Sequence, residues 1–199
     1  MKNKKKVPEI SIIIPCYNLE NIVKTTVKNI LENLEKFSDS FEILIVNDGS
    51  TDNTLEVIQD IKNNHECIHV ITYSQNKGKG YAVKTGILQS IGSSIVFIDG
   101  DLDITPDAIQ NYVEELNNFD LVIGSKLLQN SEIEIRQSRK ILSDIFSSLV
   151  KFLTGLKIQD TQVGFKVGNG EDLRKIFKVM NIDGFAFDVE LLVIATKLN

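Results

Sequence analysis

The sequence has few of the residues that build disulfide frameworks or metal clusters. It contains no tryptophan, three prolines, two histidines and two cysteines. Cys16 and Cys67 lie in different segments without CxxC spacing, and His65 and His69 have no carboxylate or cysteine partner at ligand spacing. A chain of 199 residues can bury a continuous core without disulfides or a structural metal. We therefore expect free, buried thiols in a reducing compartment, and histidines with structural or surface roles.

Positive charge and long apolar runs are also scarce. The chain has 22 basic and 27 acidic residues and a net charge of -5, which argues against a nucleic-acid partner. A small cluster of lysines within residues 2–6 is interpreted as a solvated tail, with weak contact to anionic lipid as the alternative. No run approaches the roughly 20 apolar residues of a spanning helix. We expect a cytoplasmic protein, at most peripheral at the cytoplasmic membrane face.

Short apolar runs alternate with helical spacings of apolar residues in the first 123 residues. Such alternation, with nearly continuous apolar strands, is typical of an α/β protein. It predicts a mostly parallel central sheet with helices on both faces. Helices are expected over about 21–36, after an Asp52 cap, from about Ala82 to Ile91, and from Thr105. Strands are expected over 10–14, 41–46, 68–73, 94–98 and 119–123.

Three polar segments directly follow apolar strands, around Asp48, Asn76 and Asp99. The carboxyl ends of parallel strands share one rim of a sheet, where ligands bind in such folds. We therefore expect these three segments to converge on one site.

The acidic cluster Asp99-Gly100-Asp101-Leu102-Asp103 is the strongest chemical signal. Asp99 and Asp101 are two residues apart at a strand end, so their carboxylates would crowd on one side. Like charges that close raise each other's pKa unless a cation neutralises them. Mg²⁺ or Mn²⁺ with oxygen ligands is the natural solution, and such an ion stabilises a departing diphosphate. The alternative is a solvated acidic turn.

Two further segments favour binding of a nucleotide. The stretch 47–52 could read the edge of a nucleobase or a ribose hydroxyl, although a turn followed by a helix cap explains the same residues. The glycine-rich stretch 76–86 opens a helix and offers backbone N–H groups to anions. Its glycines fit neither G-x-G-x-x-G nor a Walker pattern, which argues against a dinucleotide site or P-loop. Lys77, Lys79 and Lys84 could contact phosphate.

The pattern changes after residue 123. Residues 141–153 carry a wide apolar stripe, which predicts a helix packed on the sheet or a partner subunit, or one that meets lipid. Arg136 and Arg139 suit phosphate recognition, with a solvated basic face as the alternative. Ser125 has no candidate histidine partner, which argues against a hydrolase triad.

These segments together resemble the family 2 glycosyltransferases with the GT-A fold, and within them the polyprenyl-phosphate (dolichyl-phosphate) glucosyl- and mannosyltransferases. The resemblance covers nearly the whole chain in order. Its motifs are residues 14–18, 47–52, 76–86, 99–103, 124–126, 160–166 and 187–192.

The resemblance implies a role for each matching residue. The acceptor phosphate would be held by Lys126, Arg136 and Arg139, and Asp160 would shape the sugar and acceptor pocket. Asp101, Asp160 and Arg139 would be the catalytic residues. The metal, Mg²⁺ or Mn²⁺, would be held by Asp99, Asp101 and Asp103. The nucleotide sugar would be bound by Pro15, Tyr17, Asn18, Glu20, Asp48, Lys79, Gly80, Asp99 and Gly100.

The implied reaction is inverting transfer of a hexose from UDP-glucose or GDP-mannose to a polyprenyl or dolichyl phosphate. Peripheral contact of the protein with the membrane is implied as well, and the oligomeric state is left open. One GT-A domain would span residues 1–199, with a nucleotide-binding half at 1–123 and an acceptor-side half at 124–199. The chain departs from the family at three points. Leu19 interrupts an acidic run, Lys126 stands where arginine is common, and Asp103 where glutamine is common. The chain also ends at Asn199, where relatives continue.

Three alternatives remain open from the sequence. One is a GT-A transferase acting on a polysaccharide or another acceptor. A second is a sugar-nucleotide-forming nucleotidyltransferase, against which Pro15-Cys16-Tyr17 argues, because a glycine-rich basic loop is expected there. The third is a truncated, non-catalytic module that binds nucleotide sugars.

Overall fold

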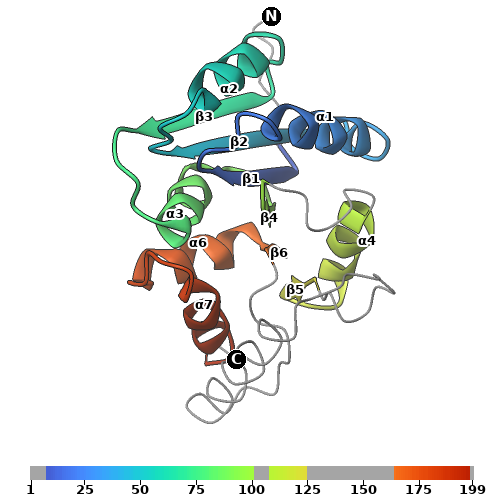
Figure 1. Cartoon of the computed structure of the whole chain (residues 1–199). Helices are drawn as coiled ribbons and strands as arrows, with labels where there is room; N and C mark the ends of the chain where they lie inside the picture. The colour runs from blue at the N-terminus through green and yellow to red at the C-terminus, as the bar shows by residue number, and fades with distance from the viewer. Residues whose placement is uncertain (1–7, 101–107, 125–163, 198–199) are drawn as a thin grey trace, which may run out of the picture.

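The computed structural model describes residues 8–100, 108–124 and 164–197 (Figure 1). Within these ranges, six strands form one sheet in the order β3-β2-β1-β4-β6-β5. Strands β3, β2, β1 and β4 run parallel, and β6 runs antiparallel to both β4 and β5. The strands are β1 (Ile10–Cys16), β2 (Phe41–Asp48), β3 (Ile68–Tyr73), β4 (Ser94–Ile98), β5 (Leu121–Ile123) and β6 (Phe165–Asn169).

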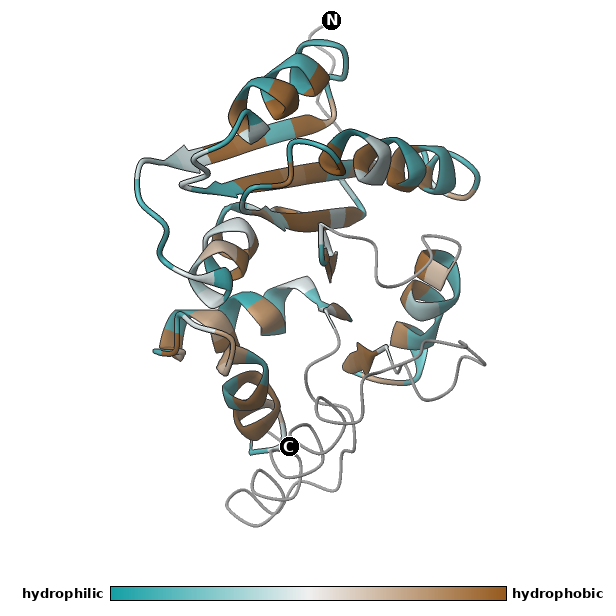
Figure 2. Ribbon diagram, in the orientation of Figure 1, coloured by the Kyte–Doolittle hydropathy of each residue, from teal (hydrophilic) through white to brown (hydrophobic). Residues whose placement is uncertain are grey.

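Helices cover both faces of this sheet. Since successive residues of a strand point to opposite faces, neighbouring residues of one strand pack against different helices. Ile12 and Ile14 of β1 pack in one buried cluster with residues of α1, α2 and α4, whereas Ile13 packs in a second cluster with α3, α6 and α7. Figure 2 shows β1 and β2 mostly hydrophobic, and helices α1 and α2 with both kinds of surface. The helices are α1 (Val23–Leu34), α2 (Thr54–Asn63), α3 (Lys79–Gln89), α4 (Ala108–Glu114), the 3-10 turn η1 (Glu115–Asn117), α6 (Gly170–Val179) and α7 (Phe187–Ala195).

The predicted α/β class and mostly parallel sheet are confirmed. The strands predicted over 68–73 and 94–98 have those bounds in the structure. The strand predicted to begin at Phe119 begins at Leu121, because the Phe119 N–H still bonds to the Glu115 carbonyl of the preceding helical turn, at 3.0 Å. Asp52 does not occupy the cap position of α2, which belongs to Asn53, but its carboxylate accepts the Thr54 N–H at 3.0 Å.

Two elements that the sequence analysis does not predict, β6 and α6, lie in the second half of the chain. Asn169 ends β6 and caps α6, since its side-chain oxygen accepts the N–H groups of Glu171 and Asp172. The final helix, α7, begins at Phe187, the first residue of the motif 187–192, and ends at Ala195. The helix predicted over 141–153 lies outside the described residues, and the proposed division into two halves stays a prediction.

The expectation of two free, buried thiols is met in full by Cys16 and in part by Cys67. Cys16 and Cys67 are free, Cys16 is buried and Cys67 half-buried. Burial raises the pKa of the Cys16 thiol to about 12, so it stays protonated and packs as a small apolar side chain. None of the helices within the described ranges is long and apolar enough to cross a membrane.

Candidate functional site

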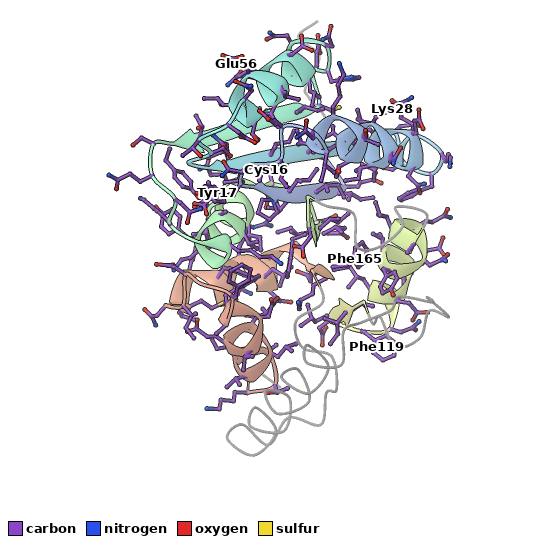
Figure 3. All side chains as sticks on the ribbon, in the orientation of Figure 1. Cys16, Tyr17, Lys28, Glu56, Phe119 and Phe165 are labelled. Atoms are coloured by element: carbon purple, nitrogen blue, oxygen red, sulfur yellow. The ribbon has the colours of Figure 1, made fainter. Side chains whose placement is uncertain are left out.

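A cavity of about 450 Å³ opens at the carboxyl rim of the parallel strands. Its walls come from the ends of β1, β2 and β4, from the connection between β3 and α3, and from the stretch before α7. Figure 3 labels Cys16 and Tyr17 at the end of β1, on this side of the molecule. The lining residues are Pro15, Cys16, Tyr17, Leu19, Asp48, Asn76, Gly78, Lys79, Ala82, Asp99, Gly100 and Phe185.

Asp48, the last residue of β2, organises the glycine-rich turn that follows β3. One carboxylate oxygen accepts the Lys77 N–H at 2.8 Å, and the other accepts the Gly78 N–H at 3.0 Å. The Asn76 side chain donates to the Asp48 carbonyl at 3.2 Å. Gly78 has a φ of 98°, a backbone conformation that favours glycine. The convergence of the first two strand-end segments, around Asp48 and Asn76, is therefore confirmed.

Asp99, directly after β4, brings the third segment to the same cavity. Its carboxylate lies 2.6 Å from the ammonium of Lys79, the first residue of α3. The two side chains are 21% and 17% exposed, so both still reach solvent from the cavity wall. The Asp99 N–H donates to the Gly164 carbonyl at 2.9 Å, which fixes the start of β6 beside the carboxylate.

The Asp99 carboxylate fits a role as metal ligand. It is a hard oxygen donor, faces the cavity and already pairs with a cation, the Lys79 ammonium. Asp101 and Asp103, the other two predicted ligands, lie outside the described residues. Within residues 8–100, 108–124 and 164–197, no three His, Cys, Asp or Glu side chains group together as a metal site.

A Gly164→Ala substitution should disturb this carboxylate specifically. A Cβ at Gly164 would lie 1.7 Å from an Asp99 carboxylate oxygen, so the carboxylate must move. We expect the Kd for Mn²⁺, measured by calorimetry, to rise at least tenfold. Gly184→Ala is the matched control, because a Cβ there meets no atom within 4 Å. Equal Mn²⁺ affinity in the Gly164 variant and the control would contradict the proposed ligand role of Asp99.

Asn18 and Glu20, predicted to bind the nucleotide, connect two loops beside the cavity. Asn18 has a φ of 55°, and its side-chain oxygen accepts the Thr51 N–H at 2.8 Å. The Glu20 carboxylate accepts the Asn53 N–H at 2.8 Å. Neither residue is among those that line the cavity. Both therefore hold the β1–α1 loop against the β2–α2 loop, which supports the wall formed by Pro15 and Tyr17.

The other predicted residues divide in the same way. Pro15, Tyr17, Lys79 and Gly100 line the cavity, whereas Gly80 does not. A Cβ on Gly80 would lie 2.8 Å from both the Ile182 carbonyl and the Phe187 Cβ, so this glycine permits close packing. The predicted acceptor-side residues lie outside the described residues: Lys126, Arg136, Arg139 and Asp160.

Behind Asp99 lies a buried ion pair to which the sequence assigned no role. The Lys166 ammonium of β6 is 2.5 Å from the Asp188 carboxylate in the first turn of α7, and it lies 5.3 Å from the centre of the Phe97 ring. Burial lowers the pKa of Lys166 and raises that of Asp188, and both groups also feel the charges of Lys79 and Asp99. The available signal was one charged residue inside each of two apolar stretches, 165–167 and 187–189.

The arrangement of strands and helices is the GT-A fold, as comparison with solved structures shows. The structure is similar to glucosyl-3-phosphoglycerate synthase from Mycobacterium tuberculosis in complex with Mn²⁺, UDP and phosphoglyceric acid. The TM-score is 0.70 at 19% identity, over 96% of this chain and 65% of that one. It is also similar to the mannosyltransferase PcManGT from Pyrobaculum calidifontis in complex with GDP-Man and Mn²⁺. There the TM-score is 0.58 at 20% identity, over 85% of this chain and 47% of that one.

The chain belongs to glycosyl transferase family 2, whose sequence profile matches residues 11–177. It is similar to the dolichyl-phosphate beta-glucosyltransferase of Dictyostelium discoideum, at 36% identity over 100% of this chain and 66% of the relative. It is also similar to the Saccharomyces cerevisiae protein of the same name, at 33% identity over 94% of this chain and 63% of the relative. The chain thus spans just under two thirds of the length of these relatives.

Proposed function

We propose that the chain forms the donor-binding part of a metal-dependent, inverting glucosyltransferase that moves glucose from UDP-glucose to dolichyl or polyprenyl phosphate. The observation that carries the proposal is the convergence of Asp48, Lys79 and Asp99 on one cavity at the carboxyl rim. The chemistry of this cavity suits a nucleoside diphosphate, and the choice of glucose and dolichyl phosphate is supported by the names of the relatives.

In the proposed reaction, Asp99 would hold Mg²⁺ or Mn²⁺ together with Asp101 and Asp103. The ion would supply charge neutralisation for the leaving diphosphate. The Lys79 ammonium, 2.6 Å from Asp99, would add a second positive charge on the same side. A phosphate oxygen of the acceptor is already a competent nucleophile, so no strong general base is required. Catalysis would then depend on positioning and on electrostatic stabilisation of the leaving group.

The acceptor side of the proposal rests on residues 124–199. Lys126, Arg136 and Arg139 would hold the acceptor phosphate, and Asp160 would shape the pocket for sugar and acceptor. Because a dolichyl or polyprenyl chain resides in a membrane, the protein would work in peripheral contact with the cytoplasmic face.

A transfer assay tests this proposal. The purified chain is incubated with UDP-[¹⁴C]glucose, dolichyl phosphate in detergent micelles and Mn²⁺, and lipid-extractable label is counted. We expect label that depends on both dolichyl phosphate and Mn²⁺, and none from GDP-[¹⁴C]mannose. Labelled lipid from GDP-mannose but not UDP-glucose would contradict the choice of donor. Label that forms without dolichyl phosphate would contradict the choice of acceptor.

A further inference from the structure

Few aromatic side chains are exposed in the described part of the chain, and most of them gather at one place. Tyr17 is 45% exposed, Phe119 60% and Phe185 75%. Tyr17 and Phe185 line the cavity at the carboxyl rim, from opposite ends of the chain. An exposed phenylalanine loses the benefit of burial, so its position beside a cavity needs an explanation other than stability.

Phe185 lies in the segment 181–186, which is firmly held although its aromatic ring is exposed. The Glu190 carboxylate accepts the N–H groups of Asn181 and Ile182, at 3.0 and 2.8 Å. The Asp183 carbonyl accepts the Tyr81 N–H at 3.0 Å, which ties the segment to α3. The segment is therefore hydrogen-bonded to two helices, α7 through Glu190 and α3 through Tyr81.

Packing fixes both flanks of the same segment. A Cβ on Gly78 would lie 2.7 Å from the Asp183 carbonyl, so the backbones meet in direct contact there. Phe187 is fully buried, with its ring centre 6.1 Å from that of Phe97. The next residue, Asp188, forms the buried ion pair with Lys166. The backbone that holds Phe185 at the cavity is thus fixed in place. A contact preorganised in this way binds a ligand with a smaller loss of conformational entropy.

We propose that the Phe185 ring stacks on the nucleobase of the donor and is a contact residue of the nucleotide pocket; this inference rests on the proposed function. The segment that carries Phe185 packs on Gly78, whose N–H is bonded to Asp48, and on Gly80 at the start of α3. The charged pair of Lys79 and Asp99 suits the diphosphate and its metal. The exposed rings of Tyr17 and Phe185 line the same cavity and suit a flat base, which gains affinity by stacking on an aromatic side chain.

The test compares Phe185→Ala with wild type by calorimetric titration of UDP and of UDP-glucose in the presence of Mn²⁺. We expect both Kd values to rise by the same factor, about tenfold, because base and aromatic ring lose their stacking. Phe185→Tyr, which keeps the ring, should restore wild-type affinity. The thermal unfolding midpoint should stay unchanged, since the side chain is 75% exposed.

Phe119→Ala is the matched control, because Phe119 is exposed beside β5, in a different part of the molecule (Figure 3), and lines another cavity. Unchanged UDP affinity in Phe185→Ala would overturn the inference. Loss of UDP-glucose affinity alone would also overturn it, by moving the contact to the sugar. An equal loss in the Phe119 control would show that the effect is not local. Failure of the proposed function is distinguishable, because wild type would then bind neither nucleotide.

Discussion

Asp99→Asn should abolish Mn²⁺-dependent binding of UDP-glucose and lower glucosyl transfer by about 1000-fold or more. The substitution keeps the shape of the side chain but removes the negative charge that faces the cavity and now pairs with Lys79. Removal of one electrostatic contact to a transition state typically costs about 100- to 1000-fold in rate, and here a metal ligand is lost as well. The transfer assay measures the rate, and calorimetry with and without Mn²⁺ measures donor binding.

Asp60→Asn is the control for this variant. Asp60 lies on α2 and is exposed, so the same loss of one carboxylate charge should leave both measurements at the wild-type level. An Asp99→Asn variant that still binds UDP-glucose more tightly with Mn²⁺ than without would show that the metal site is elsewhere.

Asp188→Ala should lower the free energy of unfolding by about 3–5 kcal/mol. The substitution removes the Asp188 carboxylate from the buried Lys166 ammonium, and breaking a buried ion pair in this way is among the largest penalties that a single change produces. Denaturant unfolding, followed by circular dichroism, gives the free energy of each variant. Because the segment 181–186 is hydrogen-bonded to α7, the affinity of the cavity for the nucleotide should fall together with the free energy of unfolding.

Two comparisons separate the effect of a buried charge from a general loss of contacts. The double variant Lys166→Met with Asp188→Leu removes both charges and should recover most of the lost stability, because apolar pairs of similar volume often replace buried ion pairs without cost. Glu32→Ala breaks the exposed pair of Lys28 and Glu32 on α1 and should cost about 0.5 kcal/mol or less. A double variant less stable than Asp188→Ala would contradict this explanation.

Much of the sheet could be predicted from the sequence, because buried strands of a parallel sheet are continuous apolar runs. Ile68–Tyr73 and Ser94–Ile98 were placed at their observed bounds for this reason. β6 could not be found this way, since Phe165–Asn169 contains a lysine and a glycine within five residues. It is a strand because it pairs with β4 and β5, which is a property of the tertiary structure.

The site was predictable where chemistry follows directly from a strand end. Asp48 and Asp99 each follow an apolar run, and the topology brings them to one cavity. Asn18 and Glu20 lie beside the cavity as expected, but their hydrogen bonds to the neighbouring loop were not predicted, and their role toward the nucleotide stays a prediction. Which partner a loop side chain finds depends on the neighbouring loop, here 50–53, and no sequence spacing encodes it.

The ion pair of Lys166 and Asp188 and the exposed ring of Phe185 could not be predicted, because both depend on which elements the tertiary structure brings together. Lys166 and Asp188 are 22 residues apart and meet only because α7 begins beside β6. Phe185 belongs to no recognisable motif, and only its exposed position at the cavity marks it.

Calorimetric titration of the folded chain with UDP-glucose and with GDP-mannose, each with and without Mn²⁺, tests whether the cavity at the carboxyl rim is a metal-dependent nucleotide-sugar site. We predict tight binding of UDP-glucose that requires Mn²⁺, and little binding of GDP-mannose under either condition. A folded chain that binds UDP-glucose no better with Mn²⁺ than without would contradict the metal site at Asp99, and no binding of either donor would contradict the nucleotide-sugar pocket itself.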